Sequence, residues 1–543
     1  MGSIKGKMAL SGDAIDHIFK GEQRHEDNPA VHRAKRPFFI GIFSSPVLWR
    51  SEKFRGRKEV MSLGKMLAQS AEKYGDQVAL IHGERRISFR DLNRFAAALG
   101  NHLRSLGLRK GDKVAVMFPN CPEFVVAYFA VQKIGGVAVT LNVQSTPYEL
   151  RHLLGNSDTK CLITQEGLAK RFEEIREELP LCRHLITANG EGIPFGPIVT
   201  NAPSEDVIPE LADDDPAVMI YTAGLTGRPL GAVLTHKNLL TQSLLLRTIC
   251  HRGAGDRGLA IIPFFHSFGA VSNMVSPLRV GASVVLMDRF TLEGIFTAIE
   301  KERVTYIAAV PRLFLGMLFF EGAERFQVDS LKLCITGGAA MPPDFIPVFE
   351  EKFKVKIMEG YGLTEASPVS SFSRLDMPQK HGSIGTPIPN VEAKIVDDQG
   401  REVPRGTIGE LILRGENIMK GYYKDPERTA QVLKDGWLYT SDLGRMDDEG
   451  YIFLTGRKKR MIITSGFNVY PREIEIVLEL HPSVAKASIV GKEDLLRGEI
   501  VKALVVRKPG ADTDERELLK HCRTYLSTYK VPREIEWVEK IGE

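Results

Sequence analysis

The sequence predicts an α/β fold, in which a large N-terminal domain of parallel-sheet α/β layers is followed by a small C-terminal α/β domain. Two observations lead to this prediction. From Met61 onward, stretches with helical periodicity alternate with short apolar strands, a pattern typical of parallel sheets whose faces are both covered by helices. In addition, a chain of 543 residues is too long for one ordinary core and indicates at least two domains.

The alternation is clearest in the first part of the large domain. One helix is predicted from apolar residues that recur at helical spacing, namely Leu92, Phe95, Ala96, Leu99, Leu103 and Leu106. Gly107 should end this helix, and the apolar run 113–118 then predicts a buried strand. A further helix over 124–134 and a strand over 137–141 continue the pattern.

Two changes in composition mark domain boundaries. Residues 1–60 carry no sustained periodicity and include a charged patch at 50–58, so we expect an extension that lies on the surface. Peripheral contact of this patch with a membrane stays open as an alternative to a solvated surface. The four consecutive cations from Arg457 to Arg460 predict a solvated hinge or an ordinary charged turn. The predicted domains are therefore the N-terminal extension, 1–60, the large domain, 61–456, and a small C-terminal lid, 457–543.

Bulk composition excludes several classes of function. A net charge of +4 among 72 basic and 68 acidic side chains gives no case for nucleic-acid binding. The six cysteines show no C-x-x-C spacing, which argues against zinc and disulfides and fits a reducing cytosol. No apolar run reaches the roughly 18 residues that a membrane helix needs, and charged residues interrupt the N-terminus where a signal peptide would be apolar. We therefore expect a cytoplasmic protein without a transmembrane segment.

The stretch 221–231 carries the strongest functional signal. It follows the apolar run 218–220 and combines three glycines with two threonines. A strand that opens into such a loop can wrap phosphate oxygens, because glycine lets backbone N–H groups approach closely and threonine adds hydroxyl donors. A tight hairpin is the alternative. The loop is not the common P-loop, since neither Lys-Ser nor Lys-Thr follows its last glycine.

A second motif, Glu-Gly-Tyr-Gly-Leu-Thr-Glu, occupies residues 359–365. The ring of Tyr361 can stack on adenine, and the Thr364 hydroxyl can donate to a phosphate oxygen. Glu365 can be a ligand to the Mg²⁺ that bridges phosphates. The alternative is that Thr364 only caps a helix.

Three further segments carry candidate residues. His266 lies among aromatic residues at 263–269, and a lone histidine in such a place is more often a core residue. A Gly-Gly-Ala turn at 337–339 follows a buried strand, where such turns are common. Asp442 lies in a predicted turn at 436–444, and its carboxylate could accept from both hydroxyls of a ribose. Otherwise this segment is a polar turn after a core tryptophan.

In their order and spacing, these motifs resemble those of the adenylate-forming superfamily of acyl-CoA synthetases, firefly luciferase and peptide-synthetase adenylation domains, closest to fatty-acid–CoA ligases. The resemblance covers nearly the whole chain apart from its extension. The family's phosphate loop usually reads Tyr-Thr-Ser-Gly-Thr-Thr-Gly-x-Pro-Lys-Gly, and this chain departs from it at Ala223, Leu225 and Leu230. Two hydroxyls and one ammonium are thus missing from the loop that, in the family, holds the departing pyrophosphate.

The resemblance implies a β-barrel-like part in the large domain and a mobile lid that rotates about a hinge at Arg460. It also implies residue roles. For ATP these are Thr222, Gly224, Thr226, Gly227, Gly338, Ala339, Ala340, Glu359, Gly360, Tyr361, Gly362, Thr364, Asp442 and Arg457. For the acyl substrate they are His266 and Gly338, and for CoA they are Ser465, Gly466 and Phe467. The implied catalytic residues are Thr222, Thr364 and Glu365, with Glu365 as the metal ligand.

The implied function is that of an AMP-forming acyl-CoA synthetase, an acid–thiol ligase that converts a carboxylic acid, ATP and CoA to acyl-CoA, AMP and pyrophosphate. The apolar neighbours of His266 suggest a fatty or other apolar acid. Two alternatives stay open, an acyl-AMP ligase that loads a carrier protein and a nucleotide- or acyl-binding pseudoenzyme. The lysine of the family's final motif has no counterpart before Glu543, so we expect a lid that is truncated at its end. A homodimer also stays open.

Overall fold

The structure is a computed structural model that describes residues 61–189, 192–223, 228–458, 461–494 and 497–541. The predicted extension 1–60 lies outside the described residues. The same holds for four predicted site residues and for one altered residue of the phosphate loop, namely Gly224, Thr226, Gly227, Arg460 and Leu225.

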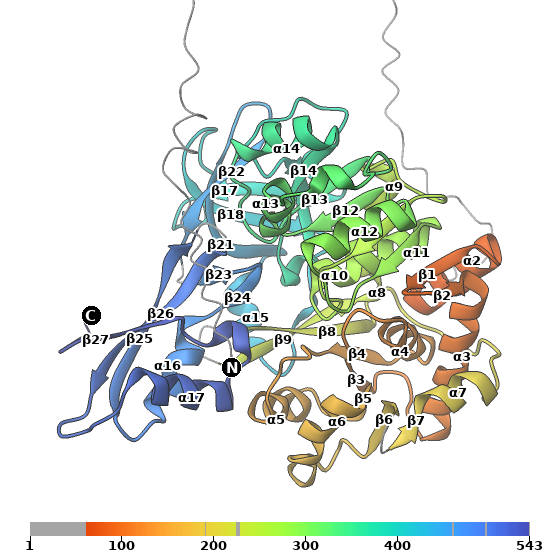
Figure 1. The fold of residues 1–543 in the computed structure, drawn as a ribbon, viewed down its shortest axis with the longest axis horizontal. Coiled ribbons are helices and arrows are strands. Elements are labelled where there is room, and N and C mark those ends of the chain that lie inside the picture. The colour runs from red at the N-terminus through yellow and green to blue at the C-terminus, as the bar shows by residue number, and fades with distance from the viewer. Residues whose placement is uncertain (1–60, 190–191, 224–227, 459–460, 495–496, 542–543) are drawn as a thin grey trace, which may run out of the picture. The chain divides into compact units, whose positions relative to one another are not determined.

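Two sheets with parallel centres form most of the large domain (Figure 1). The first has the strand order β19-β9-β8-β4-β3-β5-β6-β7, and its pairs from β8 to β7 are all parallel. At the other end, β8, β9 and β19 pair antiparallel. The strands are β3 (Lys113–Met117), β4 (Val137–Thr140), β5 (Thr159–Gln165), β6 (His184–Ala188), β7 (Ile193–Pro194), β8 (Pro216–Ala223), β9 (Pro229–Thr235) and β19 (Gly421–Tyr422).

The second sheet has the strand order β16-β15-β14-β13-β12-β10-β11-β1-β2. Its centre, from β14 to β1, is parallel, and antiparallel strands lie at both edges. The strands are β1 (Val78–His82), β2 (Arg85–Ser88), β10 (Arg257–Ala260), β11 (Ser283–Leu286), β12 (Tyr306–Ala309), β13 (Leu333–Thr336), β14 (Lys356–Gly362), β15 (Val369–Phe372) and β16 (Thr386–Pro387).

Helices cover these sheets and fill the space around them. The core around α4 joins residues of both sheets, among them Val114 of β3 and Val284 of β11. Because α4 is apolar on all sides, it can be buried on every face. The helices are α2 (Leu63–Tyr74), α3 (Phe89–Ser105), α4 (Pro122–Lys133), α5 (Pro147–Asn156), α6 (Glu166–Glu173), α7 (Phe195–Asn201), α8 (His236–Gln242), α9 (Leu245–Thr248), α10 (Ser267–Ala270), α11 (Ser276–Val280), α12 (Leu292–Glu302), α13 (Pro311–Leu318), α14 (Phe345–Phe353) and α15 (Pro426–Val432).

The four elements predicted between residues 92 and 141 are confirmed as α3, β3, α4 and β4. The helix α3 begins at Phe89, before its first predicted apolar residue, because Ser88 caps it by accepting from the Asp91 N–H. Gly107, with φ of 90°, follows its end as predicted.

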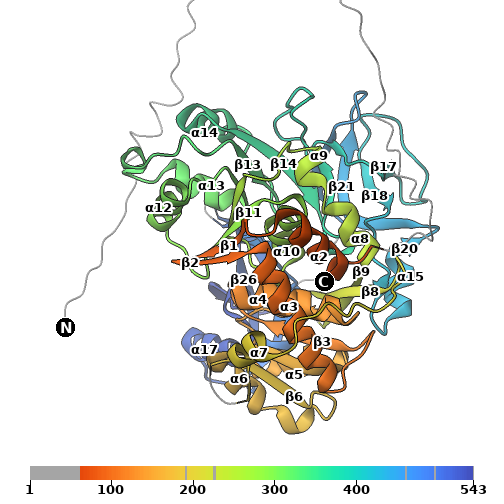
Figure 2. The same cartoon turned by 90° about the vertical axis from the view of Figure 1, so that its right-hand side faces the viewer.

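An antiparallel five-stranded sheet follows these two sheets in the large domain. Strands β17, β18, β21 and β20 pair in this order, with β22 on β21, and four of them are labelled together in Figure 2. The strands are β17 (Val391–Val396), β18 (Gly409–Gly415), β20 (Leu433–Lys434), β21 (Trp437–Met446) and β22 (Ile452–Arg457). The prediction of a turn at 436–444 is therefore wrong, because β21 covers most of this segment. The segment is part of strand β21, in which Asp442 pairs with Arg457 of β22. The register of this pair of strands shifts between Leu443 and Gly444.

The C-terminal part has a sheet and a hydrophobic core of its own. Residues of α16, β25 and β26 fill this core, which contains Ile474, Ile489 and Val505. The elements are β23 (Ile462–Thr464), β24 (Phe467–Val469), α16 (Pro471–Glu479), β25 (Val484–Asp494), β26 (Gly498–Arg507), α17 (Glu515–Tyr525) and β27 (Glu534–Trp537). β22 ends at Arg457, next to the predicted boundary after Gly456, and this boundary stays a prediction.

Among the described helices, none has both the length and the apolar character that crossing a membrane requires.

Candidate active site

A cavity of about 760 Å³ brings together most of the predicted site residues. The carboxyl ends of β13 and β14 line part of it. Ligands of open α/β sheets are usually bound at such strand ends. Of the predicted residues, those that line this cavity are Thr222, His266, Gly338, Ala339, Ala340, Glu359, Gly360, Tyr361, Gly362, Thr364, Glu365, Asp442, Arg457 and Gly466.

The loop that was predicted to bind phosphate joins β8 to β9, which form an antiparallel hairpin. Thr222 is the next-to-last residue of β8 and pairs with Leu230 across the hairpin. Both residues line the cavity. Strands β8 and β9 thus form a hairpin, as the alternative interpretation proposed, and two of its residues, Thr222 and Leu230, line the cavity.

Glu365 accepts two hydroxyl hydrogen bonds. Thr222 Oγ1 donates to its Oε1 over 3.2 Å, and the hydroxyl of Tyr422 donates to the same oxygen over 2.9 Å. Burial raises the pKa of Glu365, whereas the hydrogen bonds from the two hydroxyls lower it. The two hydroxyls therefore hold the carboxylate in place on the cavity wall.

Thr364 opens the short 3₁₀ helix Thr364–Ala366, but its hydroxyl does not cap it, since the N-cap is Leu363. The capping alternative is therefore wrong. The hydroxyls of Thr364 and Ser267 lie 3.2 Å apart and share a hydrogen bond. Through this contact the Thr364 side chain is fixed beside the start of α10.

Asp442 is buried between two partners. Its Oδ1 lies 2.7 Å from Arg457 Nε, and the hydroxyl of Tyr361 donates to its Oδ2. Burial raises the pKa of Asp442, while the positive charge of Arg457 and the Tyr361 hydroxyl lower it. The motif at 359–365 and the strand pair β21–β22 thus meet in one polar group on the cavity wall.

His266 is a neutral imidazole. Burial lowers its pKa to about 4, so that it carries no charge at neutral pH. Its Nδ1 accepts from the Phe268 N–H over 3.3 Å and caps α10. In the neutral ring, an accepting Nδ1 leaves the proton on Nε2, which can donate to a carboxylate or carbonyl oxygen.

Close packing explains several of the predicted glycines. A Cβ on Gly362 would lie 1.7 Å from the carbonyl oxygen of Pro368, and one on Gly360 would lie 2.8 Å from the ring of Phe372. Gly338 has a φ of 79°, in the left-handed region that favours glycine. Gly360 and Gly362 therefore have a packing role, and Gly338 a conformational role, next to their predicted role in ATP binding.

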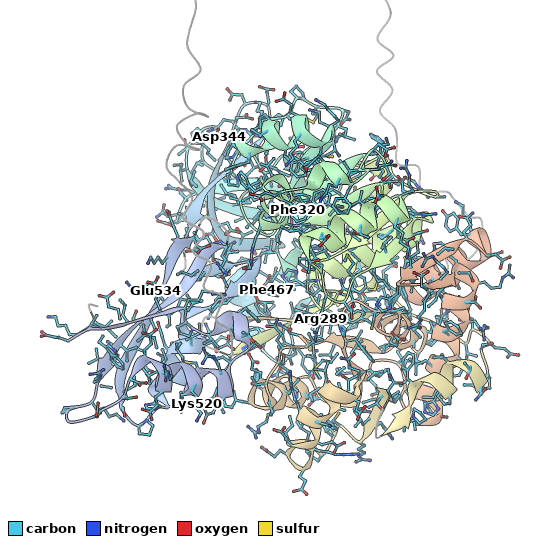
Figure 3. The ribbon with its side chains drawn as sticks, in the orientation of Figure 1. Arg289, Phe320, Asp344, Phe467, Lys520 and Glu534 are labelled. Atoms are coloured by element: carbon cyan, nitrogen blue, oxygen red, sulfur yellow. The ribbon has the colours of Figure 1, made fainter. Side chains whose placement is uncertain are left out.

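The predicted CoA residues lie against the large domain. Arg312 donates to Ser465 Oγ over 2.8 Å, and a Cβ on Gly466 would lie 2.5 Å from Val310. The ring of Phe467, labelled in Figure 3, stacks on that of Phe265 with centroids 6.5 Å apart. Phe467 also lines a second cavity of about 360 Å³, which shares Thr222, His266 and Thr364 with the first.

Sequence reasoning missed Tyr422 and Ser267, which hold Glu365 and Thr364. Tyr422 lies 57 residues from Glu365 in the chain and reaches it because β19 pairs with β9. Such a long-range contact leaves no trace in local periodicity. Ser267 directly follows His266, and only its hydroxyl could have pointed to a polar site.

The resemblance implies that Glu365 holds the metal ion of the adenylation step, so we expect Tyr422→Phe to slow that step. Loss of a hydrogen bond to a charged group costs about 1.5–3 kcal/mol, so acid-dependent ATP–pyrophosphate exchange should fall by roughly tenfold or more. Tyr423→Phe is the matched control, because its hydroxyl donates to Asp158 instead. Equal exchange rates for the two variants would contradict a role of Tyr422 at Glu365.

Comparison with known proteins shows the family to which the chain belongs. The family model described as AMP-binding enzyme matches residues 67–423, and the model described as AMP-binding enzyme C-terminal domain matches residues 473–542. The chain belongs to the AMP-binding, adenylate-forming enzyme family. Its members among curated proteins include a long-chain-fatty-acid–CoA ligase of Bacillus subtilis (strain 168), which is 33% identical over an alignment of 512 residues that covers 88% of this chain and 91% of that protein.

Other relatives differ in what their names say of the substrate. A feruloyl-CoA synthase of Amycolatopsis sp is 33% identical over 482 residues, 88% of this chain and 95% of that protein. Among solved structures, the amide bond synthetase McbA from Marinactinospora thermotolerans has a TM-score of 0.82 at 28% identity, with 89% of this chain and 96% of that chain covered. The anthranilate CoA ligase AuaEII in complex with anthranoyl-AMP has a TM-score of 0.71 at 28% identity, with 89% and 95% covered.

These matches confirm the predicted superfamily, fold class and enzyme class. The chain is an ATP-dependent, AMP-forming acyl-CoA synthetase, and ATP and CoA fit it as substrates. Neither the carrier-protein alternative nor the pseudoenzyme alternative is favoured. The roles of the individual site residues and the domain boundaries stay predictions.

Proposed function

We propose that this enzyme activates long, apolar carboxylic acids, with fatty acids as its substrate class. The observation that carries this proposal is the lining of the 760 Å³ cavity, which continues from the polar groups into an apolar region. The side chains of this region include Leu245, Leu246, Ile249, Val271, Ile335, Met341, Val369, Phe372, Ile384, Val432 and Leu438. Apolar cavities of this size suit small hydrophobic ligands.

Two polar side chains among these apolar residues, Gln242 and Ser276, are engaged by the protein backbone. The Gln242 amide donates to the Val369 carbonyl over 3.0 Å and accepts from the Val369 N–H over 3.2 Å. Ser276 donates to the carbonyl of Ser243. A pocket that selects a phenolic acid needs a polar partner for the phenol, whereas both of these side chains are bonded to the protein backbone. The lining therefore favours a fatty acid over a hydroxylated aromatic acid, in agreement with the name of the Bacillus subtilis relative.

The site residues would act in two half-reactions. In the first, a carboxylate oxygen of the acid attacks the α-phosphate of ATP, and pyrophosphate leaves with the electrons of the broken P–O bond. The hydroxyls of Thr222 and Thr364 would donate to phosphate oxygens, and Nε2–H of His266 would orient the acid. In the second, the CoA thiolate attacks the acyl carbonyl and AMP leaves, with Ser465, Gly466 and Phe467 beside the thiol arm.

Nucleotide binding is proposed for the polar group around Asp442. The carboxylate of Asp442 would accept from the ribose hydroxyls, with Arg457 beside it. The Tyr361 ring would contact adenine, together with the backbone of 338–340 and of Gly360. Glu359, whose pKa burial raises to about 7, lines the same cavity and would lie beside the nucleotide.

The residues around Glu365 fit Mg²⁺, which we propose as a cofactor. Mg²⁺ prefers one or two carboxylates together with substrate phosphates and water. Glu365 offers one carboxylate with hydroxyl neighbours, and the described residues contain no group of three or more His, Cys, Asp or Glu that would hold a metal without a substrate. When bound, Mg²⁺ would neutralise charge on the phosphates.

We also propose the cytoplasm as the location, since all six cysteines are unpaired and buried. The homodimer and the peripheral membrane contact stay predictions.

Acid selectivity tests the proposed substrate class. We expect AMP release that requires both CoA and acid, with kcat/KM rising from octanoate to palmitate and lower for ferulate and benzoate. Product AMP and acyl-CoA would be measured by chromatography. Equal or higher kcat/KM for the hydroxylated aromatic acids would contradict the proposal.

A lysine at position 230 should improve the altered phosphate loop. Because Leu230 lines the cavity opposite Thr222, Leu230→Lys would return the ammonium of the family motif to the phosphate site. A charge-assisted hydrogen bond contributes about 1.5–3 kcal/mol, so kcat/KM for ATP should rise by roughly tenfold. Leu230→Met is the uncharged control of similar length. An unchanged or lower value for the lysine variant would show that the loop has been rebuilt around another partner.

A further inference from the structure

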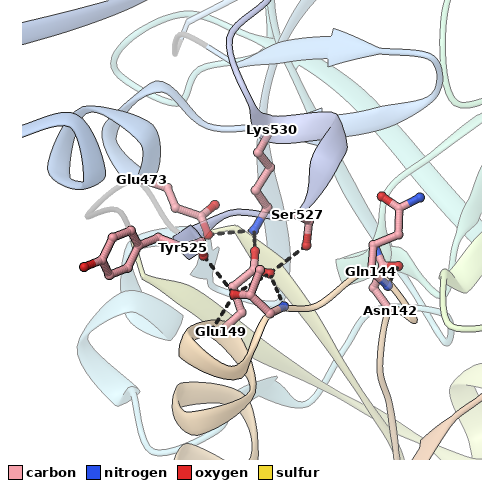
Figure 4. Close-up of polar contacts among 8 residues, drawn as sticks. Asn142, Gln144, Glu149, Glu473, Tyr525, Ser527 and Lys530 are labelled. Atoms are coloured by element: carbon pink, nitrogen blue, oxygen red, sulfur yellow. Dashed lines mark hydrogen bonds and ion pairs between the residues drawn. The ribbon is translucent and has the colours of Figure 1, made fainter. Parts of the chain in front are cut away.

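A buried group of charges joins the C-terminal part to the large domain. Lys530 donates through Nζ to Glu149 Oε1 of α5 over 2.7 Å and to Glu473 Oε1 of α16 over 2.6 Å (Figure 4). Ser527 donates to the other oxygen of Glu149 over 2.6 Å. The side chains of Lys530, Glu149 and Glu473 are 8%, 6% and 9% exposed. We call these four residues the Lys530 cluster.

Because the Lys530 cluster is buried, the loss of any one of its charges is costly. Although burial opposes ionisation, Lys530 and Ser527 keep the pKa of Glu149 below its ordinary value. A buried ion pair adds little net stability over apolar residues, but removal of one partner is strongly destabilising because it leaves a buried charge without compensation. An arrangement in which Lys530 pairs with Glu149 is therefore much lower in free energy than one in which either charge is buried without its partner.

Within the Lys530 cluster, the contacts of Glu149 are the ones that cross between the two parts. Lys530, Ser527 and Glu473 all belong to the C-terminal part, so their mutual contacts do not depend on where this part lies. Glu149 also belongs to the capping box of α5, in which its Oε2 accepts from the Thr146 N–H. Oε1 takes no part in the cap and is left for Lys530. A capping role alone would not require a buried lysine from the other part.

The cluster is connected to the proposed CoA segment through aromatic rings. Tyr529, next to Lys530, stacks on Phe467 with ring centroids 4.6 Å apart. Phe467 in turn stacks on Phe265, which precedes His266. The residues of the cluster, Tyr529 and Phe467 line the second cavity, which shares His266 and Thr364 with the first. The arrangement that pairs Lys530 with Glu149 is thus the one that places Phe467 at the site.

We propose that Lys530 and Glu149 are positioning residues for the thioester half-reaction, in which their ion pair fixes the C-terminal part with Phe467 at the site. This inference rests on the proposed role of the segment 465–467 in CoA binding. If the C-terminal part rotates between the half-reactions, the pair forms in only one of the two arrangements. Loss of the pair should then affect thioester formation and leave adenylation nearly unchanged.

Separate assays of the two half-reactions test this inference. Adenylation is followed as palmitate-dependent ATP–pyrophosphate exchange, and thioester formation as the conversion of synthetic palmitoyl-AMP and CoA to palmitoyl-CoA. For Glu149→Gln and for Lys530→Met we expect thioester formation to fall by at least about tenfold, as for a broken buried pair. Exchange should stay within roughly twofold of the unchanged enzyme, since it does not use this contact. The KM for CoA should rise, because the arrangement that binds the thiol arm is less populated.

Three further variants separate positioning from folding. Lys492→Met removes a surface pair with Glu534 that lies wholly within the C-terminal part, and it should change neither half-reaction. Lys530→Arg keeps the charge and should recover part of the lost rate. The double variant Glu149→Gln/Lys530→Met should be no slower than the slower single variant, because both changes remove the same pair.

Equal losses in the two half-reactions, or strictly additive losses in the double variant, would overturn the inference and indicate a role in folding. Unchanged thioester formation in both single variants would overturn it as well. In these cases the unchanged enzyme would still form palmitoyl-CoA, and the proposed function would stand. An unchanged enzyme that forms no acyl-CoA from any acid would overturn the proposed function and, with it, this inference.

Discussion

Glu365→Gln should raise the barrier for adenylation by about 2–4 kcal/mol, on the scale of single electrostatic groups in active sites. The change removes the anionic charge that would hold Mg²⁺ but keeps the size of the side chain. The hydroxyls of Thr222 and Tyr422, which donate to Glu365, can still donate to the amide oxygen. The fold should therefore be preserved while kcat for ATP–pyrophosphate exchange falls.

Glu392→Gln is the control for this prediction, because Glu392 forms a surface pair with Arg414. Its exchange rate and its Mg²⁺ dependence should match those of the unchanged enzyme. If Glu365→Gln also kept the original rate and Mg²⁺ dependence, the metal-binding role of Glu365 would be wrong.

Asp442→Ala should weaken ATP binding by about 1.5–3 kcal/mol, the contribution of hydrogen bonds to a charged acceptor, which is roughly 10- to 150-fold in Kd. The ribose would lose its acceptor, and Arg457 and Tyr361 would lose their shared partner. The kcat at saturating ATP should change less than Kd, since Asp442 does not touch the phosphates in the proposed site. Calorimetric titration with ATP would give Kd directly.

Asp398→Ala is the matched control for Asp442→Ala. Asp398 pairs with Lys458, the neighbour of Arg457, and its side chain is exposed. We expect an unchanged Kd for ATP in this variant. A result in which both aspartate variants bind ATP as the unchanged enzyme does would remove Asp442 from the nucleotide site.

Local elements of the fold could be predicted from the sequence because their signals are local. The spacing of apolar residues gives α3, and continuous apolar runs give β3 and β4. The interior position of α4 also follows from its composition, since a helix without a polar face must be covered on all sides. Prediction was wrong around Asp442, where polar residues suggested a turn. The segment is a strand because its backbone pairs with β18 and β22.

The candidate site could be predicted only in part. The resemblance supplied residues such as Thr222, Glu365 and Asp442, which the fold brings to one cavity. Their supporting partners were not predicted, since Tyr422 and Lys530 depend on contacts between segments far apart in the chain. The protonation states of the site residues could not be predicted from the sequence either. A neutral His266 follows from its burial, which the three-dimensional packing decides.

In the proposed reaction, this enzyme joins an apolar acid to CoA through an acyl-adenylate. The most direct measurement incubates the enzyme with ATP, Mg²⁺, CoA and palmitate labelled with ¹⁸O in its carboxylate, and follows the label by mass spectrometry. Attack of the carboxylate on the α-phosphate transfers one labelled oxygen to AMP, and the other stays in palmitoyl-CoA. We expect labelled AMP and palmitoyl-CoA in equal amounts. Palmitoyl-CoA formed with unlabelled AMP, or with ADP in place of AMP, would contradict the account.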